Sequence, residues 1–120
     1  MIHPSTRKLI DRLSEMTLLD RVAWAEGENG AIVFDSNDYR ILLSADPKQL
    51  TLTDALGKEL EFVTSEQLSE TANDEGENYA ALIDTMYVEG LRIAKGTKLA
   101  IDRIMASLDT LGAEIAQAAE

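Results

Sequence analysis

Short apolar runs alternate with turn sequences between residues 20 and 63, and this pattern limits the fold more than any other feature of the chain. In Val22 and Trp24 apolar side chains recur at every second position, as in a strand with one buried face. The tetrapeptide Gly27-Glu28-Asn29-Gly30 and the dipeptide Asp46-Pro47 are turn sequences. Connections this short join antiparallel strands, because a parallel pair needs a crossover of about a dozen residues or more. The sequence therefore predicts an antiparallel meander of four to five short strands over residues 20–63.

The predicted meander has one polar face and one apolar face. The polar positions at strand spacing are Arg40, Thr51, Thr53, Glu59 and Glu61. Antiparallel sheets commonly leave one such face in water. Trp24, Tyr39 and Phe62 occupy alternating strand positions, and we expect all three aromatic rings in the core. The apolar face therefore needs a cover from elsewhere in the chain.

Two helical segments flank the meander. Residues 4–18 form a predicted amphipathic helix with Pro4 in its first turn, where the missing N–H is no loss. Residues 77–110 form a predicted long C-terminal helix that packs on one sheet face. Its apolar positions, which share one side at 3.6 residues per turn, are Tyr79, Leu82, Ile83, Met86, Gly90, Ile93, Ala94, Thr97, Ile101, Ile104, Met105 and Leu108.

Two glycines lie inside the long helix. Gly90 is on the apolar side, where the missing side chain predicts a close approach of the helix to the sheet. Gly96 is off that side, and the sequence shows no packing reason for it. A glycine inside a helix costs about 1 kcal/mol relative to alanine. Because the apolar phase continues through both glycines, we expect one continuous helix and not a helical hairpin.

Together these segments make a single α+β domain, and a length of 120 residues suits one domain. An acidic connector, residues 64–76, joins the meander to the long helix. Within it Thr64 and Gln67 are placed to cap a single helical turn near residues 65–70. A short Ala-rich tail, residues 111–120, follows the long helix.

Charge limits the classes of partner. The chain has 22 acidic residues against 11 basic ones and a formal net charge of −11, which disfavours a nucleic-acid binder that neutralises phosphates. The densest run of acids, with no base among them, is Glu66, Glu70, Asp74, Glu75 and Glu77. One interpretation is a solvated connector whose acids favour the start of the next helix. The other is an acidic patch offered to a basic partner.

Several chemistries lack the residues that they need. The chain has no cysteine, and its one histidine, His3, lies near the N-terminus. We therefore predict no catalytic residue, no metal site and no cofactor. The alternative is a small enzyme or ligand-binding protein that uses carboxylates, with Asp54 or Asp84 as candidates.

No apolar run is long enough for a signal peptide or a membrane span, so we expect a cytoplasmic protein without a membrane partner.

The far side of the predicted long helix carries a second apolar strip. Three apolar residues and three bases lie there: Val88, Leu91, Leu99, Arg92, Lys95 and Lys98. A helix that covers only one sheet needs no apolar residues on that side. Either the N-terminal helix packs on this flank, or the strip is a contact surface for a second copy or for another protein.

These observations favour a small acidic, bacterial-type domain that acts as a non-enzymatic protein–protein interaction module, as a homodimer. In size and acidic charge alone, the chain is similar to bacterial secretion chaperones, which are α/β dimers that bind unfolded effector segments. That resemblance implies an unfolded protein segment as the partner. A further hypothesis is an acidic mimic of DNA that occupies a nucleic-acid-binding protein.

Overall fold

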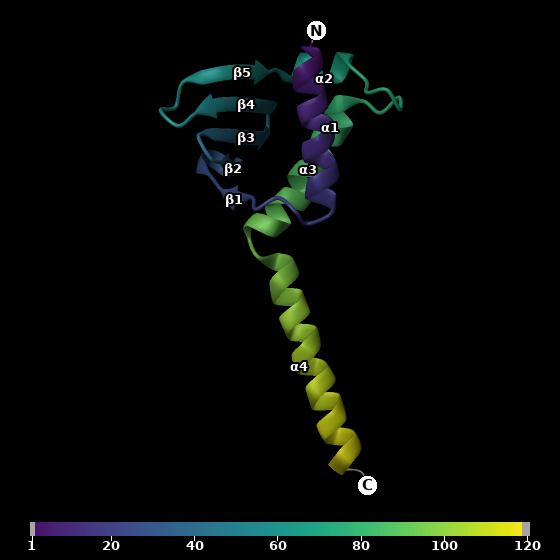
Figure 1. Cartoon of the computed structure of the whole chain (residues 1–120). Coiled ribbons are helices and arrows are strands. Elements are labelled where there is room, and N and C mark those ends of the chain that lie inside the picture. The colour runs from purple at the N-terminus through teal and green to yellow at the C-terminus, as the bar shows by residue number, and fades with distance from the viewer. Residues whose placement is uncertain (1, 119–120) are drawn as a thin grey trace.

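In a computed structural model of the protein, the backbone is described for residues 2–118, and side chains for the same range without 98 and 113–118. The elements in chain order are α1 (Pro4–Leu18), β1 (Ala25–Glu26), a 3₁₀ turn (Glu28–Gly30), β2 (Ile32–Ser36), β3 (Tyr39–Ala45), β4 (Lys48–Asp54), β5 (Glu59–Val63), α2 (Ser65–Glu70), α3 (Tyr79–Ala94) and α4 (Thr97–Ala118). The helices α1 to α3 lie beside one face of the sheet, and α4 extends away from it (Figure 1). The predicted N-terminal helix, antiparallel meander and C-terminal helical cover are confirmed.

The turns set the order and the register of the sheet. The strands pair antiparallel in the order β1-β2-β3-β4-β5. Two residues join β2 to β3, with Asn37 in the left-handed region at φ 52°, and Asp46-Pro47 joins β3 to β4. Asp54 closes the β4–β5 turn, because its Oδ1 accepts hydrogen bonds from the N–H groups of Leu56 (3.0 Å) and Lys58 (2.9 Å). Each turn returns the chain beside the strand that it has just left.

The core is built on one row of side chains that crosses four strands. Ile32, Leu43, Leu50 and Val63 pair across the sheet in register, and none is more than 1 % exposed. α3 packs over this row and contacts β1 to β4, while α1 packs beside α3. Full burial of such a side chain stabilises the fold by about 1.5–3 kcal/mol. The row therefore holds sheet and helix together.

Trp24 connects α1 to the sheet. Its buried indole Nε1–H donates to Oγ1 of Thr17 (2.9 Å), and the Thr17 hydroxyl donates to the carbonyl of Leu13 (2.7 Å). A buried indole N–H needs such an acceptor. The prediction that Trp24 belongs to the core is confirmed, although the residue precedes β1 and does not lie in a strand.

The same prediction is wrong for Tyr39 and Phe62, which are 52 % and 38 % exposed. In β5 the inward position belongs to Val63, so the adjacent Phe62 points to the opposite face, where it pairs with Thr51. Tyr39 is the first residue of β3, and it lines an apolar hollow together with Leu9 of α1. The predicted alternation in β5 differs from the observed one by one residue, and such a shift exchanges the two faces of a strand.

The prediction of one continuous helix over residues 77–110 is also wrong. α3 ends at Ala94 and α4 begins at Thr97, with Gly96 between them in the left-handed region at φ +70°. The Gly96 N–H donates to the carbonyl of Ile93 (3.0 Å), which closes the last turn of α3. A left-handed residue after a helix is most often glycine, because a Cβ is disfavoured there. Gly96 is therefore explained by the backbone and not by packing.

The connector contains the helical turn that the sequence indicates. In α2 the Thr64 hydroxyl accepts from the N–H of Gln67 (3.2 Å), and the Gln67 side chain accepts from the N–H of Thr64 (2.9 Å). This reciprocal cap is confirmed, and Leu68 anchors α2 in the core. Residues 111–118 of the predicted tail belong to α4.

Gly90 brings α3 close to the sheet, as predicted. A Cβ at this position would lie 2.5 Å from Cδ1 of Ile32 and 3.1 Å from Cδ1 of Trp24. We expect Gly90→Ala to destabilise the protein by about 1–3 kcal/mol, because the core must move to admit the methyl group. The control is Gly112→Ala in α4, where nothing lies within 4 Å of the added atom. Urea unfolding measures both variants, and equal stability of the two would contradict the close approach.

The buried phenol of Tyr79 is expected to make the free energy of unfolding fall at alkaline pH. Burial first, and then the hydrogen bond from its hydroxyl to Oδ2 of Asp11 (3.1 Å), raises the pKa of Tyr79 to about 12 from an ordinary value of 10.0. The neutral phenol is therefore favoured in the folded state, and its contribution is complete below pH 10 and is lost as the pH rises towards 12. We expect a loss on the order of 2 kcal/mol over that interval.

Tyr79→Phe should make the alkaline decline in unfolding free energy shallower, since phenylalanine has no proton to lose. Tyr39→Phe is the matched control, because the ring of Tyr39 is exposed. Urea unfolding at a series of alkaline pH values tests this expectation. If both variants decline as steeply as the unchanged protein, another group is responsible.

Candidate functional site

Several exposed large apolar residues lie together on α4. The helix has 22 residues, so it is about 33 Å long, and the whole molecule extends over 67 × 35 × 23 Å. α4 contacts α3 at the corner around Gly96 and then projects away from the sheet (Figure 1). The apolar side of this helix therefore does not cover the sheet, which corrects the expectation for residues 97–110.

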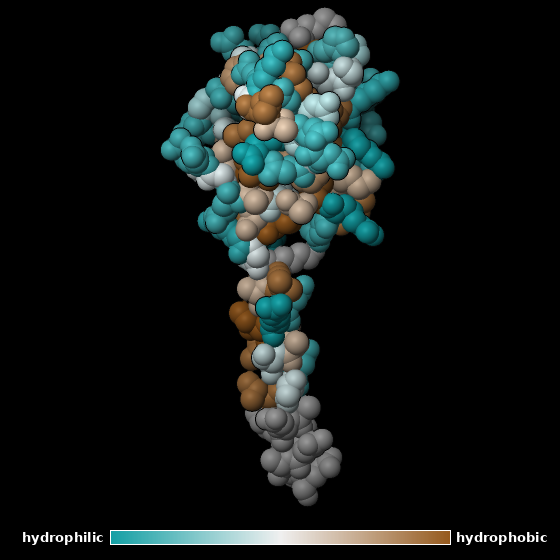
Figure 2. Space-filling view, turned by 60° about the vertical axis from the view of Figure 1, so that its left-hand side comes forward, coloured by the Kyte–Doolittle hydropathy of each residue, from teal (hydrophilic) through white to brown (hydrophobic). Residues whose placement is uncertain are grey.

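Four large apolar residues form a line along α4, which we call the α4 stripe: Ile101, Ile104, Leu108 and Leu111. They are between 46 % and 57 % exposed, and Met105 beside them is exposed to a similar degree. Their spacing of three, four and three residues keeps them on one side of a helix. Hydrophobic side chains are visible along one side of α4 in Figure 2. The stripe is an apolar surface that α4 presents to water.

The predicted partner strip on α3 and α4 is divided by the structure. Val88 and Leu99 are exposed, whereas Leu91 is partly buried and packs against the core. Of the three apolar residues of the strip, Leu91 is therefore the one that packs within the fold. Leu99 lies on the side of α4 opposite the stripe, where it lines a hollow of about 280 Å³ with Ile93 and Gly96.

The bases of that strip lie around the corner between the two helices. Arg92 forms a 3.8 Å ion pair with Glu89, and Lys95 follows the last residue of α3. The side chain of Lys98 lies outside the described side chains. Positive charge at the C-terminal end of α3 also complements the negative end of the helix dipole.

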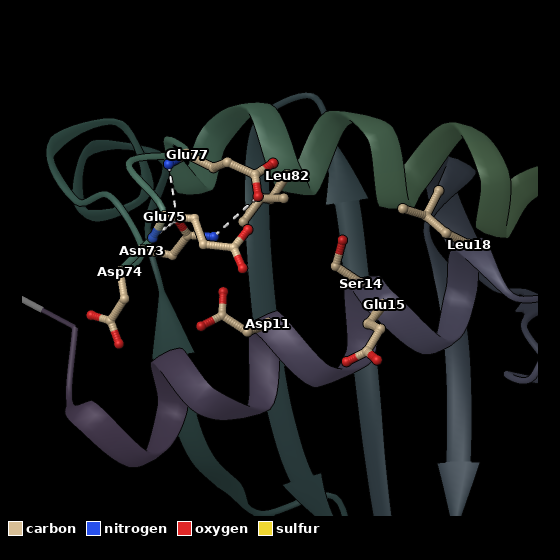
Figure 3. A pocket seen from close by; sticks show the side chains of 9 residues that line it. All are labelled: Asp11, Ser14, Glu15, Leu18, Asn73, Asp74, Glu75, Glu77 and Leu82. Atoms are coloured by element: carbon tan, nitrogen blue, oxygen red, sulfur yellow. Dashed lines mark hydrogen bonds between the residues drawn. The ribbon is translucent and has the colours of Figure 1, made fainter.

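Three of the five predicted acidic-patch residues, Asp74, Glu75 and Glu77, line one hollow of about 420 Å³ between the connector and α1 (Figure 3). The other two, Glu66 and Glu70, lie on α2 and are not among its lining residues. α1 adds Asp11, Ser14 and Glu15 across the hollow, so both walls are acidic.

The acidic hollow is organised by its own hydrogen bonds. Oδ1 of Asn73 accepts from the N–H groups of Glu75 (3.0 Å) and Glu77 (2.8 Å), which orders the loop (Figure 3). No group of three or more carboxylates and histidines within the described residues is arranged to hold a metal ion. The hollow offers negative charge to a basic group.

The two carboxylates considered for catalysis lie far apart. Asp54 closes a turn at one end of β4. Asp84 on α3 forms a 2.8 Å ion pair with Lys48 at the other end of the same strand. The six residue steps from Lys48 to Asp54 correspond to about 20 Å along the strand. Asp54 and Asp84 therefore do not form an acid–base pair.

His3 is used structurally. Its Nδ1 accepts a hydrogen bond from the N–H of Ser5 (3.1 Å), which caps the first turn of α1. None of the helices in the described part of the chain is long and apolar enough to cross a membrane. No family model, curated protein or solved structure shows a significant match to this chain.

The three apolar residues of the predicted partner strip differ in burial, so their replacement should change the unfolding free energy by different amounts. We expect Leu91→Ser to cost at least about 1 kcal/mol, because its side chain packs against the core. Val88→Ser and Leu99→Ser should each change the unfolding free energy by less than about 0.5 kcal/mol, since both are exposed. Urea unfolding separates the two groups, and a cost for Val88→Ser as large as that for Leu91→Ser would contradict the assignment.

Proposed function

We propose that this protein is a non-enzymatic interaction module, which binds another protein chain through the α4 stripe, in the cytoplasm. The observation that carries the proposal is the exposure of four large apolar residues on a helix that projects from the domain. Contiguous exposed apolar surface on a small protein is typical of an interaction site.

The energetics of α4 support an external partner. Most helical stability in proteins comes from packing of an apolar side of the helix. Among the residues that the structure describes, none covers the α4 stripe in this way. Completing the burial of four half-exposed Leu and Ile side chains is worth roughly 3–6 kcal/mol. A partner that covers the stripe would therefore stabilise both the complex and the helix.

The arrangement of titratable groups also favours binding over catalysis. Asp54 and His3 cap a turn and a helix, and Asp84 is paired with Lys48. An acid–base catalyst needs such groups held together within hydrogen-bonding reach of a substrate. Each of these groups instead has a local structural role.

The test is affinity purification of the tagged full chain from its native host, followed by identification of the bound proteins. The variant Ile104→Asp with Leu108→Asp places two charges in the stripe. The matched control, Ala106→Asp with Thr110→Asp, places the same charges at the same spacing on the other side of α4.

We expect a stoichiometric partner, which includes an untagged copy of the chain itself, to be lost with the stripe variant and retained with the control. The stripe variant would bury unpaired carboxylates in the contact, so it should recover at least about 100-fold less of the partner. The same partners with all three proteins, or none with any, would contradict the proposal.

A further inference from the structure

We infer that the α4 stripe binds α4 of a second copy of this chain, with the two helices antiparallel and crossing near residue 106. The inference rests on the proposed function and names its partner. It follows from the spacing of the stripe, from the charge along α4 and from the position of the rest of the domain.

The spacing of the stripe is that of a coiled coil. With Ile101 and Leu108 at position a of a seven-residue repeat, Ile104 and Leu111 occupy position d. A repeat of this kind matches a second helix better than a flat sheet, because each apolar side chain inserts between residues of the facing helix. The occupant is therefore a helix.

The stripe is also complementary to itself when one copy is reversed. In antiparallel pairing Ile101 faces Leu111 of the second copy, and Ile104 faces its Leu108. Because 101 and 111, like 104 and 108, are equally far from residue 106, the two helices cross at that residue. All four stripe residues of one helix then meet the four of the other. A two-fold axis through this point closes the contact as a dimer.

The charge along α4 favours the antiparallel orientation. The half of α4 next to the domain carries Lys98, Asp102 and Arg103, and the distal half carries Asp109 and Glu114. These formal charges are +1 and −2 respectively. Antiparallel pairing places the basic half of each helix beside the acidic half of the other, whereas parallel pairing in register would place like halves together. Exposed pairs of this kind contribute little affinity but do select an orientation.

The rest of the domain is compatible with this arrangement. Because α4 projects from the corner at Gly96 (Figure 1), antiparallel helices place the two domains at opposite ends of the pair. The distal acidic half of each α4 then approaches the corner of the other copy, where Arg92 and Lys95 lie. Small residues flank the seam at Ala100, Ser107 and Gly112, which allows the helices to approach closely.

The first experiment measures the mass of the full chain by light scattering over a range of concentrations. We expect twice the 13.2 kDa of the chain for the unchanged protein and for Ala106→Asp with Thr110→Asp. Ile104→Asp with Leu108→Asp should weaken the dimer at least about 100-fold. The near-ultraviolet signal of Trp24, which is buried away from α4, shows whether the stripe variant still folds.

The second experiment determines the orientation, and the absence of native cysteine makes it direct. Met105 lies beside the seam, and in antiparallel pairing the two copies of this residue are about 3 Å apart along the helix axis. The two copies of Leu111 are then about 15 Å apart along that axis. We therefore expect a short bismaleimide to cross-link Met105→Cys and not Leu111→Cys. In a parallel pair in register the result is reversed, because position d meets itself and the Met105 side chains lie on opposite flanks.

A monomer at every concentration, a dimer that survives the stripe variant, or cross-linking at Leu111→Cys alone would overturn the inference. The proposed function fails separately. A monomeric chain that still captures a different protein through the stripe would retain the function and remove the second copy as its partner. Loss of both dimer and capture would remove the two together.

Discussion

The packing of α3 and α1 on the sheet relies on the close contact between α3 and the sheet at Gly90. With no side chain at this position, the backbone of α3 approaches Ile32 and Trp24 closely. That approach lets Ile83 and Met86 of the same helix be fully buried. It also brings the Trp24 indole under α3 while its N–H reaches Thr17, so one contact positions sheet, α3 and α1 together. A larger residue would separate layers whose interior is packed without space to spare.

The position of α3 also decides where the chain leaves the domain. Five strands at about 4.8 Å spacing span about 19 Å, and the 16 residues of α3 span about 24 Å. α3 is thus long enough to cross the sheet before Gly96 is reached, and it contacts β1 to β4. Residues beyond it have no sheet to cover, whatever their hydropathy. Gly96 turns the chain by adopting a left-handed conformation, and α4 presents its apolar residues outwards.

Much of the fold could be predicted from sequence because the signals are local. Each of these signals depends on a few neighbouring positions. Examples are the turn at Asp46-Pro47, the cap formed by Thr64 and Gln67, and the apolar spacing of α1. The prediction for Phe62 is wrong because strand alternation shows that two faces exist and not which of them is covered. The candidate site was the least predictable part. The sequence places Ile101, Ile104 and Leu108 on one apolar side and predicts that this side covers the sheet, whereas Leu111 falls in the predicted tail. The strip that contains Leu91 is the predicted partner surface instead.

Local residue patterns account for the antiparallel meander, the helix before it, the close approach at Gly90 and the apolar side that runs from Tyr79 to Leu108. Which part of that side is core depends on how the helices pack on the sheet. Hydrophobic periodicity records the side of a helix that avoids water, and it contains no information on how far the covered surface extends. That extent is set by the width of the sheet and by the left-handed backbone at Gly96, which together divide one apolar side into a buried cover and an exposed stripe.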